Sequence, residues 1–296
     1  MNGNPTIFDR VLLRARQLRA RALEPATFLL DRVAADMAER LAVVLRTFEH
    51  VADLDTPSGA LRNALVSSGK VAAPSRAPIR TEGALEIIVD ENDRPFTDAS
   101  LDLVVSGLAL QFVNDLPGTL IQIRRALKAD GLLLAAMIGG DSLNELREAF
   151  AQAESEVEGG LSPRVLPFAD IRDLGGLLQR AGFALPVVDS DRVIVRYDSP
   201  IALMHDLRAM GATNILVERR RSPLRRATLR RMIEIYAERF SDSDGRLRAT
   251  FEIVWLSGWA PHESQQKPLK PGSATRRLAD ALGTQEIATG EKPGDE

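Results

Sequence analysis

Acidic and small polar side chains gather where two predicted apolar strands end. Asp90 and Glu91 follow the apolar run 85–89, and Ser106 and Leu108 lie at the end of the next such run. In an open α/β sheet, ligands bind in the crevice outside the carboxyl ends of the strands. We therefore expect these four residues at a ligand-binding site. A solvated turn is the alternative for the two acids.

The chain has no cysteine and only three histidines, His50, His205 and His262. This excludes thiolate metal sites, cysteine nucleophiles and a disulfide framework. The three histidines are scattered, with no cysteines and no tight spacing of carboxylates around them, so they do not form the pattern of a metal site. We interpret His50 and His205 as structural. His262, beside Glu263, is the best candidate for a functional histidine, with a structural role as the alternative.

The charge of the chain gives little reason to expect a nucleic acid partner, since the formal net charge is -3. Arginines gather in two runs, 10–21 and 219–231, which we interpret as solvated helix faces, with a polyanion site as the alternative. The longest apolar stretch, 132–138, is too short to span a bilayer. The arginine-rich start is similar to a mitochondrial presequence, but Asp9 and Glu24 interrupt it, which favours a bacterial cytoplasm over a mitochondrial matrix.

The spacing of apolar residues predicts the elements that position these side chains. Strands are expected at 50–54, 85–89, 101–105, 132–137, 185–188, 192–197 and 249–259. Helices are expected at 8–21, 26–46, 60–67, 116–127, 141–158, 170–181, 200–210 and 223–240. Strands that alternate with helices indicate an α/β fold with a doubly wound, mostly parallel sheet.

Finer features of these elements can also be predicted. Asp115 and Asp141 are expected to cap the helices that follow them, and 189–191 is expected to form a turn between two strands. Trp255 and Trp259 lie four residues apart in a strand, hence on one face of it, where we expect them in the core or an interface.

Four regions are expected along the chain. An N-terminal helical extension covers 1–48, and the α/β core covers 49–198. A C-terminal lid and substrate region covers 199–282, and a disordered tail covers 283–296.

The core segment resembles the class I S-adenosylmethionine-dependent methyltransferases. Residues 95–106, which begin Pro95-Phe96 and end at Ser106, resemble the passage from the third to the fourth strand of that superfamily. Residues 114–117 and 124–131 resemble its next helix and turn. The resemblance implies a Rossmann-like class I methyltransferase fold with N-terminal helices and a C-terminal α+β extension.

A narrower resemblance extends over about 7–282. It is carried by Phe8-Asp9-Arg10, Gly139-Gly140-Asp141-Ser142-Leu143, the segment 208–214 and His262-Glu263-Ser264-Gln265. These segments are similar to a group of complex I assembly factors related to the malonyl-carrier-protein methyltransferase of the biotin pathway. One member of that group is described as a protein-arginine hydroxylase.

The resemblance implies S-adenosylmethionine as cofactor and a set of residues that would hold it: Asp53, Gly59, Asp90, Glu91, Ser106 and Leu108. The turn after the first strand departs from the family pattern, in which glycines stand at the positions of Asp55, Pro57 and Gly59. Asp55 brings a Cβ and a charge, and Pro57 removes an N–H donor. A plain strand-to-helix turn is therefore the alternative to a cofactor loop.

Two other positions of the family pattern are altered. Glu82 is the only acidic residue between Gly69 and Ala84 and would match the ribose-binding acid, with a surface glutamate as the alternative. The shortness of this stretch and its Pro74 and Pro78 indicate that the second helix of the fold is missing or collapsed. Gln111 stands where relatives often carry histidine, so no catalytic residue is assigned.

Two functions follow from the resemblance. The first is a methyltransferase-family enzyme that modifies a protein or a carrier-bound substrate in respiratory complex I biogenesis. The alternative is a non-catalytic assembly factor that binds a complex I subunit. A nucleotide-dependent dehydrogenase does not fit, since no G-x-G-x-x-G follows a strand.

Overall fold

A computed structural model describes residues 6–82, 85–89, 94–266, 280 and 283–284. By contacts between Cα atoms, the chain divides into a unit over Met1–Pro261 and a second over His262–Glu296. The predicted boundaries at residues 48, 198 and 282 stay predictions.

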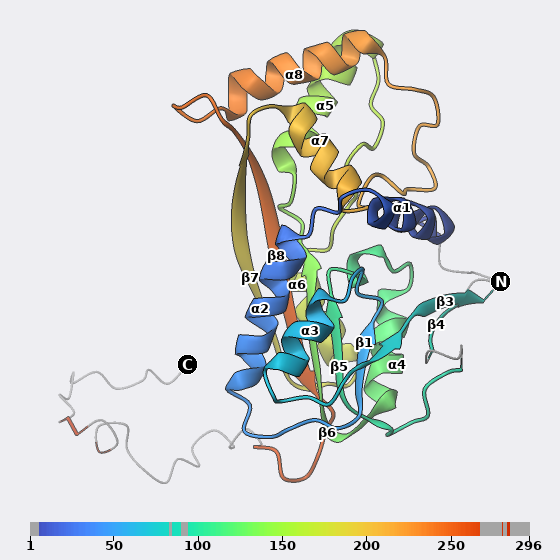
Figure 1. The fold of residues 1–296 in the computed structure, drawn as a ribbon, viewed down its shortest axis with the longest axis vertical. Helices are drawn as coiled ribbons and strands as arrows, with labels where there is room; N and C mark the ends of the chain where they lie inside the picture. Colours follow the sequence, from blue (N-terminus) through green and yellow to red (C-terminus); the bar gives the residue numbers. More distant parts are fainter. Residues whose placement is uncertain (1–5, 83–84, 90–93, 267–279, 281–282, 285–296) are drawn as a thin grey trace, which may run out of the picture. The chain divides into compact units, whose positions relative to one another are not determined.

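A six-stranded sheet forms the centre of the first unit, in the order β2-β1-β5-β6-β8-β7 (Figure 1). Four neighbouring strands pair in parallel, and β8 is antiparallel to both its neighbours. This confirms the doubly wound, mostly parallel sheet. The strands are β1 Val51–Leu54, β2 Ser75–Ala77, β5 Leu101–Gly107, β6 Leu127–Ile138, β7 Ala184–Tyr197 and β8 Leu247–Trp259.

Helices cover both faces of the sheet, and two adjacent residues of β5 pack against opposite layers of helices. Val104 packs in the cluster beneath α4 (Leu116–Ala126) and α6 (Ile171–Arg180). Leu103 packs in the opposite cluster beneath α2 (Phe28–Ala42) and α3 (Ala60–Ser67). Adjacent residues of a strand point to opposite faces, so a strand covered on both sides is apolar throughout.

The two tryptophans confirm a sequence prediction. Trp255 is buried in the cluster beneath α2 and α3, and Trp259 packs against the same cluster. Both are part of the core, as their spacing in a strand predicts.

The predicted strand at 85–89 forms, but not as a strand of the main sheet. It is β4 (Leu85–Ile88), which pairs antiparallel with β3 (Ile79–Glu82) in a separate hairpin. Only residues 78–84 separate β2 from β4, and a parallel neighbour requires a crossover of a dozen or more residues. The chain therefore folds back on itself after β2. The expected loss of the second helix is confirmed.

The predicted turn at 189–191 is wrong, because β7 runs unbroken and pairs with β8 through these residues. Two arginines of α2 neutralise the acids that suggested the turn. Arg40 donates to both carboxylate oxygens of Asp189 at 2.8 Å, and Arg32 donates to Asp191 at 2.7 Å. Long-range ion pairs thus replace the local hydrogen bonds that a turn would have used.

The two predicted helix caps have different outcomes. The Asp115 side chain accepts a hydrogen bond of 2.9 Å from the N–H of Gly118 at the start of α4, which confirms the first. Helix α5 (Asn144–Glu158) begins three residues later than predicted, after Leu143. Asp141 instead forms an ion pair with Arg192 of β7, so its prediction as a cap is wrong.

A further group of helices lies beyond the carboxyl ends of the parallel strands (Figure 1). Helices α5, α7 (Pro200–Ala209) and α8 (Arg226–Phe240) share a cluster with the start of β8. Helix α1 (Arg10–Ala22) packs against the segment after α7. A Cβ at Gly211 would lie 2.9 Å from the Cα of Gln17, so only glycine allows this approach.

Candidate functional site

The turn after β1 is tied to the neighbouring strand β5 by side-chain hydrogen bonds. Thr56 donates through Oγ1 to the carboxylate of Asp53 and accepts a 2.9 Å bond from the N–H of Gly107. Ser106 donates through Oγ to the carbonyl of Leu54 at 2.9 Å. The structure thus brings Asp53 and Ser106 to one edge of the sheet, as predicted. Their side chains form hydrogen bonds with other residues of the chain.

Burial raises the pKa of Asp53 to about 6, although the hydrogen bond from Thr56 acts in the opposite direction. The Asp53 side chain is therefore a weakly solvated acid at the carboxyl end of β1.

An ion pair occupies the middle of the turn. Asp55 has a left-handed backbone with φ 55°, and its Oδ2 lies 2.7 Å from the guanidinium of Arg10. Arg10 is only 6% exposed, and the same nitrogen also reaches the carbonyl of Ile79 at 3.2 Å. Helix α1 therefore inserts a cation at the position where the family pattern has a glycine.

Two further residues of the turn, Pro57 and Gly59, also have roles within the chain. The carbonyl of Pro57 accepts hydrogen bonds from the guanidinium of Arg21. Gly59 caps the start of α3 with an ordinary right-handed backbone of φ -79°. Pro57 has no N–H to offer a ligand, unlike a glycine at the same position.

The other residues predicted for the site do not all lie together. Leu108 has a left-handed backbone, φ 52°, and lines a large cavity. Gln111 lines the same cavity, and its Nε2 donates to the carbonyl of Leu108 at 2.8 Å. Asp90 and Glu91 lie outside the described residues. The backbone of Glu82 ends β3, away from the main sheet.

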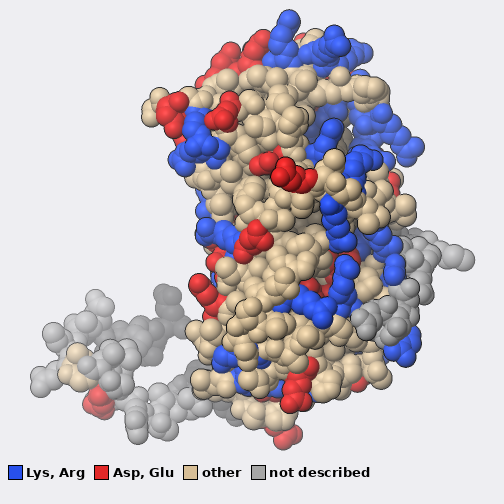
Figure 2. All heavy atoms as spheres, in the orientation of Figure 1, with Lys and Arg blue, Asp and Glu red and all other residues tan. Residues whose placement is uncertain are grey.

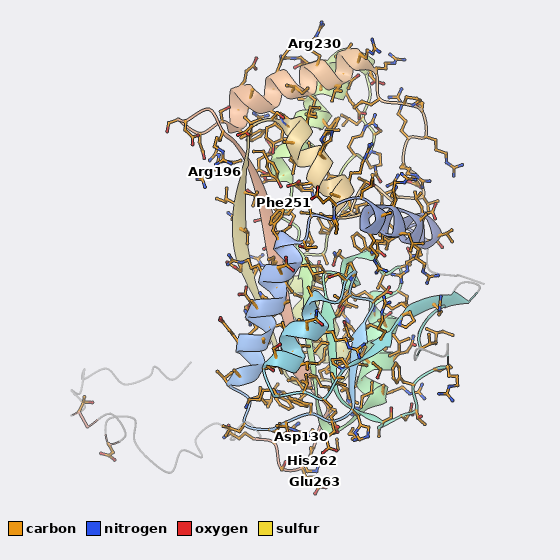
Figure 3. All side chains as sticks on the ribbon, viewed as in Figure 1. Asp130, Arg196, Arg230, Phe251, His262 and Glu263 are labelled. Atoms are coloured by element: carbon orange, nitrogen blue, oxygen red, sulfur yellow. The ribbon has the colours of Figure 1, made fainter. Side chains whose placement is uncertain are left out.

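Two cavities adjoin the carboxyl ends of the strands. The smaller, about 290 Å³, lies beside the β1 turn and is lined by Asp53, Asp55, Thr56, Arg76, Ala77, Pro78 and Arg80. The larger, about 790 Å³, is lined by α1, the start of α2, the loop after β5, α5, α7 and the segment 208–214. Phe251, on β8, lies at the wall of the larger cavity (Figure 3).

The turn after β1 does not fit the amino-acid end of S-adenosylmethionine, which carries a carboxylate. Asp55 would place a second carboxylate against it, and Pro57 offers no N–H. The cation beside Asp55, Arg10, is already paired with it. The roles in cofactor binding assigned to Asp53, Gly59, Ser106 and Leu108 stay predictions.

Each histidine with a recorded polar contact has its own local partners. His50 Nδ1 lies 3.0 Å from a carboxylate oxygen of Asp102, which also pairs with Lys128 at 2.8 Å. Burial alone would raise the pKa of Asp102, but hydrogen bonds from Lys128 and His50 hold it well below its ordinary value. In the second unit, His262 Nδ1 lies 2.7 Å from Ser264 Oγ. A functional role for His262 stays a prediction.

Interpreting the arginine runs as solvated helix faces is wrong for several members. Arg10 is buried at the β1 turn, and Arg16, Arg21, Arg219, Arg220 and Arg221 line the larger cavity. His205, interpreted as structural, also lines it. The signal in the sequence was the density of arginine in 10–21 and 219–231, which helical periodicity alone assigns to solvent.

Comparisons with known proteins identify the family of the chain. A methyltransferase domain family matches residues 37–135. The mitochondrial arginine-hydroxylase NDUFAF5 of Mus musculus is 38% identical over 298 residues, covering 97% of this chain and 87% of that protein. The malonyl-[acyl-carrier protein] O-methyltransferase of Laribacter hongkongensis (strain HLHK9) is 35% identical over 270 residues, with 91% and 78% covered.

Among solved structures, phosphoethanolamine N-methyltransferase 2 of Haemonchus contortus, in complex with S-adenosyl-L-methionine, is 14% identical. The similarity covers 78% of this chain and 53% of that one, with a TM-score of 0.43.

The strand order, the parallel core and the matched domain define a class I methyltransferase-like protein. Within that class, the chain belongs to the family of the arginine-hydroxylase NDUFAF5, which is related to the malonyl-[acyl-carrier protein] O-methyltransferases. In the described part of the chain, no helix is both long and apolar enough to cross a membrane.

Proposed function

We propose that this protein is a methyltransferase-fold assembly factor in respiratory complex I biogenesis that binds a protein partner without transferring a methyl group. The resemblance of the chain to complex I assembly factors supports the biological role. The ion pair between Arg10 and Asp55 is the observation that supports the absence of methyl transfer. It fills the position at which a cofactor carboxylate would have to bind.

The energetics support this view. Arg10 and Asp55 are 5% and 27% exposed, so the pair is largely withdrawn from water. Separating the partners of a buried pair costs about 3–5 kcal/mol. A cofactor that had to break it would bind about a hundredfold more weakly, or worse, than one entering an open loop.

The alternative is an enzyme that uses S-adenosylmethionine to modify a protein or a carrier-bound substrate, or that hydroxylates arginine. The 38% identity to the arginine-hydroxylase NDUFAF5 supports it. The altered turn at Asp55 and Pro57 argues against it, since both changes act on the cofactor loop itself.

The cellular test is deletion of the gene in the organism that encodes it. We expect the amount of assembled complex I on native gels to fall and to be restored by the wild-type gene. We also expect the complex I subunits of both strains to have equal masses. A methyl or hydroxyl group that depends on the gene would contradict the non-catalytic role, and unchanged complex I would contradict the assembly role.

The compartment is part of the proposal. The sequence favours a bacterial cytoplasm, and the matrix is the alternative because NDUFAF5 is named as mitochondrial. Fractionation of cells that express the tagged full-length chain distinguishes the two.

A further inference from the structure

The larger cavity is lined by cations and by no described acidic residue. The face drawn in Figure 2 carries both basic and acidic side chains. The cavity differs, because its described lining contains seven arginines and no aspartate or glutamate. They are Arg16, Arg21, Arg164, Arg208, Arg219, Arg220 and Arg221.

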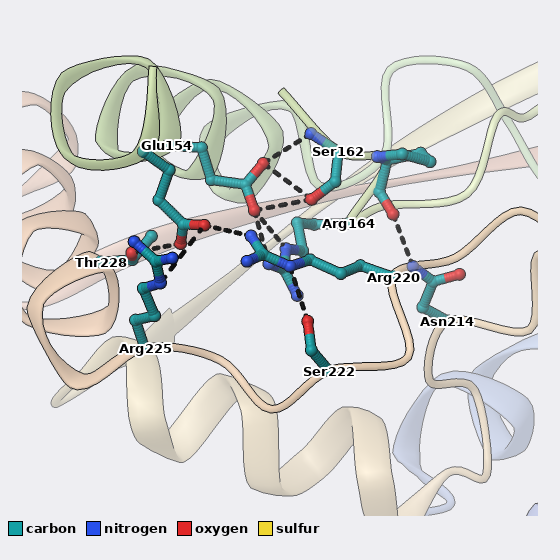
Figure 4. Close-up of polar contacts among 10 residues, drawn as sticks. Glu154, Ser162, Arg164, Asn214, Arg220, Ser222, Arg225 and Thr228 are labelled. Carbon is teal, nitrogen blue, oxygen red and sulfur yellow. Dashed lines mark hydrogen bonds and ion pairs between the residues drawn. The ribbon is translucent and has the colours of Figure 1, made fainter. Parts of the chain in front are cut away.

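Three of these arginines form ion pairs with acidic residues that do not line the cavity. Arg164 donates through Nε to Glu154 at 2.7 Å, and Arg220 pairs with Glu158 (Figure 4). Arg219 lies 3.4 Å from a carboxylate oxygen of Asp9. These pairs order the loops 159–168 and 211–225, which close one side of the cavity.

The other four form no ion pair among the described residues, although Asp9 partly offsets the positive charge around Arg16. Arg16 and Arg21 donate to the carbonyls of Asn214 and Pro57, which satisfies hydrogen bonds but not charge. Arg208 and Arg221 are exposed at the cavity wall. Burial and the nearby cations, chiefly Arg219, lower the pKa of Arg16, as expected where positive charge is in excess.

Behind the arginines the cavity is apolar. Leu29, Leu146, Phe150 and Phe251 line it and are each buried. A volume of about 790 Å³ lies in the range of pockets that enclose ligands. The complementary ligand therefore combines an apolar group with negative charge.

We propose that this cavity binds an acidic segment of a partner protein, with an apolar side chain against the floor and carboxylates at Arg16, Arg208 and Arg221. The inference rests on the proposed function, since an assembly factor must hold a protein. The unpaired cations come from α1, α7 and the loop after α7, so a ligand with several separated carboxylates matches them better than one head group. The same cations repel the guanidinium of an arginine substrate.

The test uses two fluorescein-labelled hexapeptides and the full-length protein. One has the sequence Asp-Glu-Leu-Phe-Glu-Asp and the other Lys-Arg-Leu-Phe-Arg-Lys, so the apolar centre is the same. We expect fluorescence anisotropy to show binding of the acidic peptide alone, weakened by added salt. Arg208→Glu and Arg221→Glu should each weaken it about tenfold.

The matched control is Arg230→Glu, which makes the same change of charge on α8 at a side chain that is 81% exposed (Figure 3). It should leave the affinity unchanged. Because Arg208 and Arg221 have no ion pair in the described chain, their variants should keep the wild-type circular dichroism and melting temperature.

Three results would overturn the inference: no binding of the acidic peptide at millimolar protein, equal binding of both peptides, or displacement of the acidic peptide by phosphatidylglycerol vesicles. The last would assign the cavity to a membrane lipid. None of them depends on complex I, so a failed peptide assay beside a complex I defect in the deletion strain removes this inference alone.

Discussion

Asp55 determines what the turn after β1 can bind. Its carboxylate neutralises Arg10, and its left-handed backbone, φ 55°, is one that glycine adopts without strain. In the function proposed above, this carboxylate takes the place of the carboxylate of a bound cofactor. Restoring glycine should therefore release Arg10 for a ligand.

The double variant Asp55→Gly with Pro57→Gly should gain affinity for S-adenosylmethionine of at least about tenfold, because it removes the competing charge and restores an N–H donor. Calorimetry measures this gain directly. Adding Arg10→Gln to the double variant is the control, and it should abolish the gain. If affinity rose equally without Arg10, the carboxylate role of that arginine would be refuted.

Asp53 makes the free energy of unfolding of the protein depend on pH. Its pKa of about 6 in the folded chain lies above the ordinary 3.8, so the folded state binds more protons than the unfolded one between these values. The free energy of unfolding therefore falls as the pH rises from about 4 to about 6, by about 3 kcal/mol from this residue. Urea denaturation across this range should show the fall in the wild type and not in Asp53→Asn.

Asp102 serves as a control, because its carboxyl group makes the free energy of unfolding change with pH in the opposite direction. Its pKa is lowered, so its stabilising contribution is present above the ordinary value and is lost as the pH falls below about 4. Asp102→Asn should therefore remove a loss of stability in acid and leave the range from pH 4 to 6 as in the wild type. Identical pH profiles for the two variants would contradict the assignment of both residues.

At the scale of elements, α2 is fixed to the edge strand β7 by Arg40. Its guanidinium makes two 2.8 Å bonds to Asp189 and lies 4.3 Å from the ring centroid of Trp255. Arg40→Ala should cost about 1–2 kcal/mol, since a bidentate pair and a cation–π contact are lost together. Thermal unfolding measures the loss. Arg230→Ala, on the exposed side of α8, should cost much less, and equal losses would contradict this role.

Elements were predictable from the sequence where local patterns and tertiary contacts agree. The apolar run 132–137 could only be a covered strand, and Asp115 caps α4 as its position before Pro117 indicates. The sequence of 189–191 favours a turn, but its backbone pairs with β8, and distant arginines of α2 neutralise its acids. Pairing partners far along the chain are not encoded in a local pattern.

The candidate site was predictable in outline but not in its contacts. The strand ends at Asp53, Ser106 and Leu108 do meet, because parallel strands share one edge. The insertion of Arg10 into the β1 turn was not predictable, since it joins residues 45 positions apart. Nor did helical periodicity reveal that two arginine runs face one cavity.

At the scale of the whole molecule, the family fold is kept while the two parts of its site differ. The sheet and the helices on its faces form a class I methyltransferase-like fold. The β1 turn is closed by its own ion pair, and the cavity beside it is open and positively charged. This combination suits a protein that binds a partner through the fold of an enzyme.

The most direct test is a calorimetric titration of the purified wild-type chain with S-adenosylmethionine, beside the Asp55→Gly, Pro57→Gly variant. A closed turn predicts no heat of binding from the wild type at millimolar ligand and measurable binding by the variant. Micromolar binding by the wild type would contradict the account, because the cofactor would then have entered despite the pair of Arg10 and Asp55.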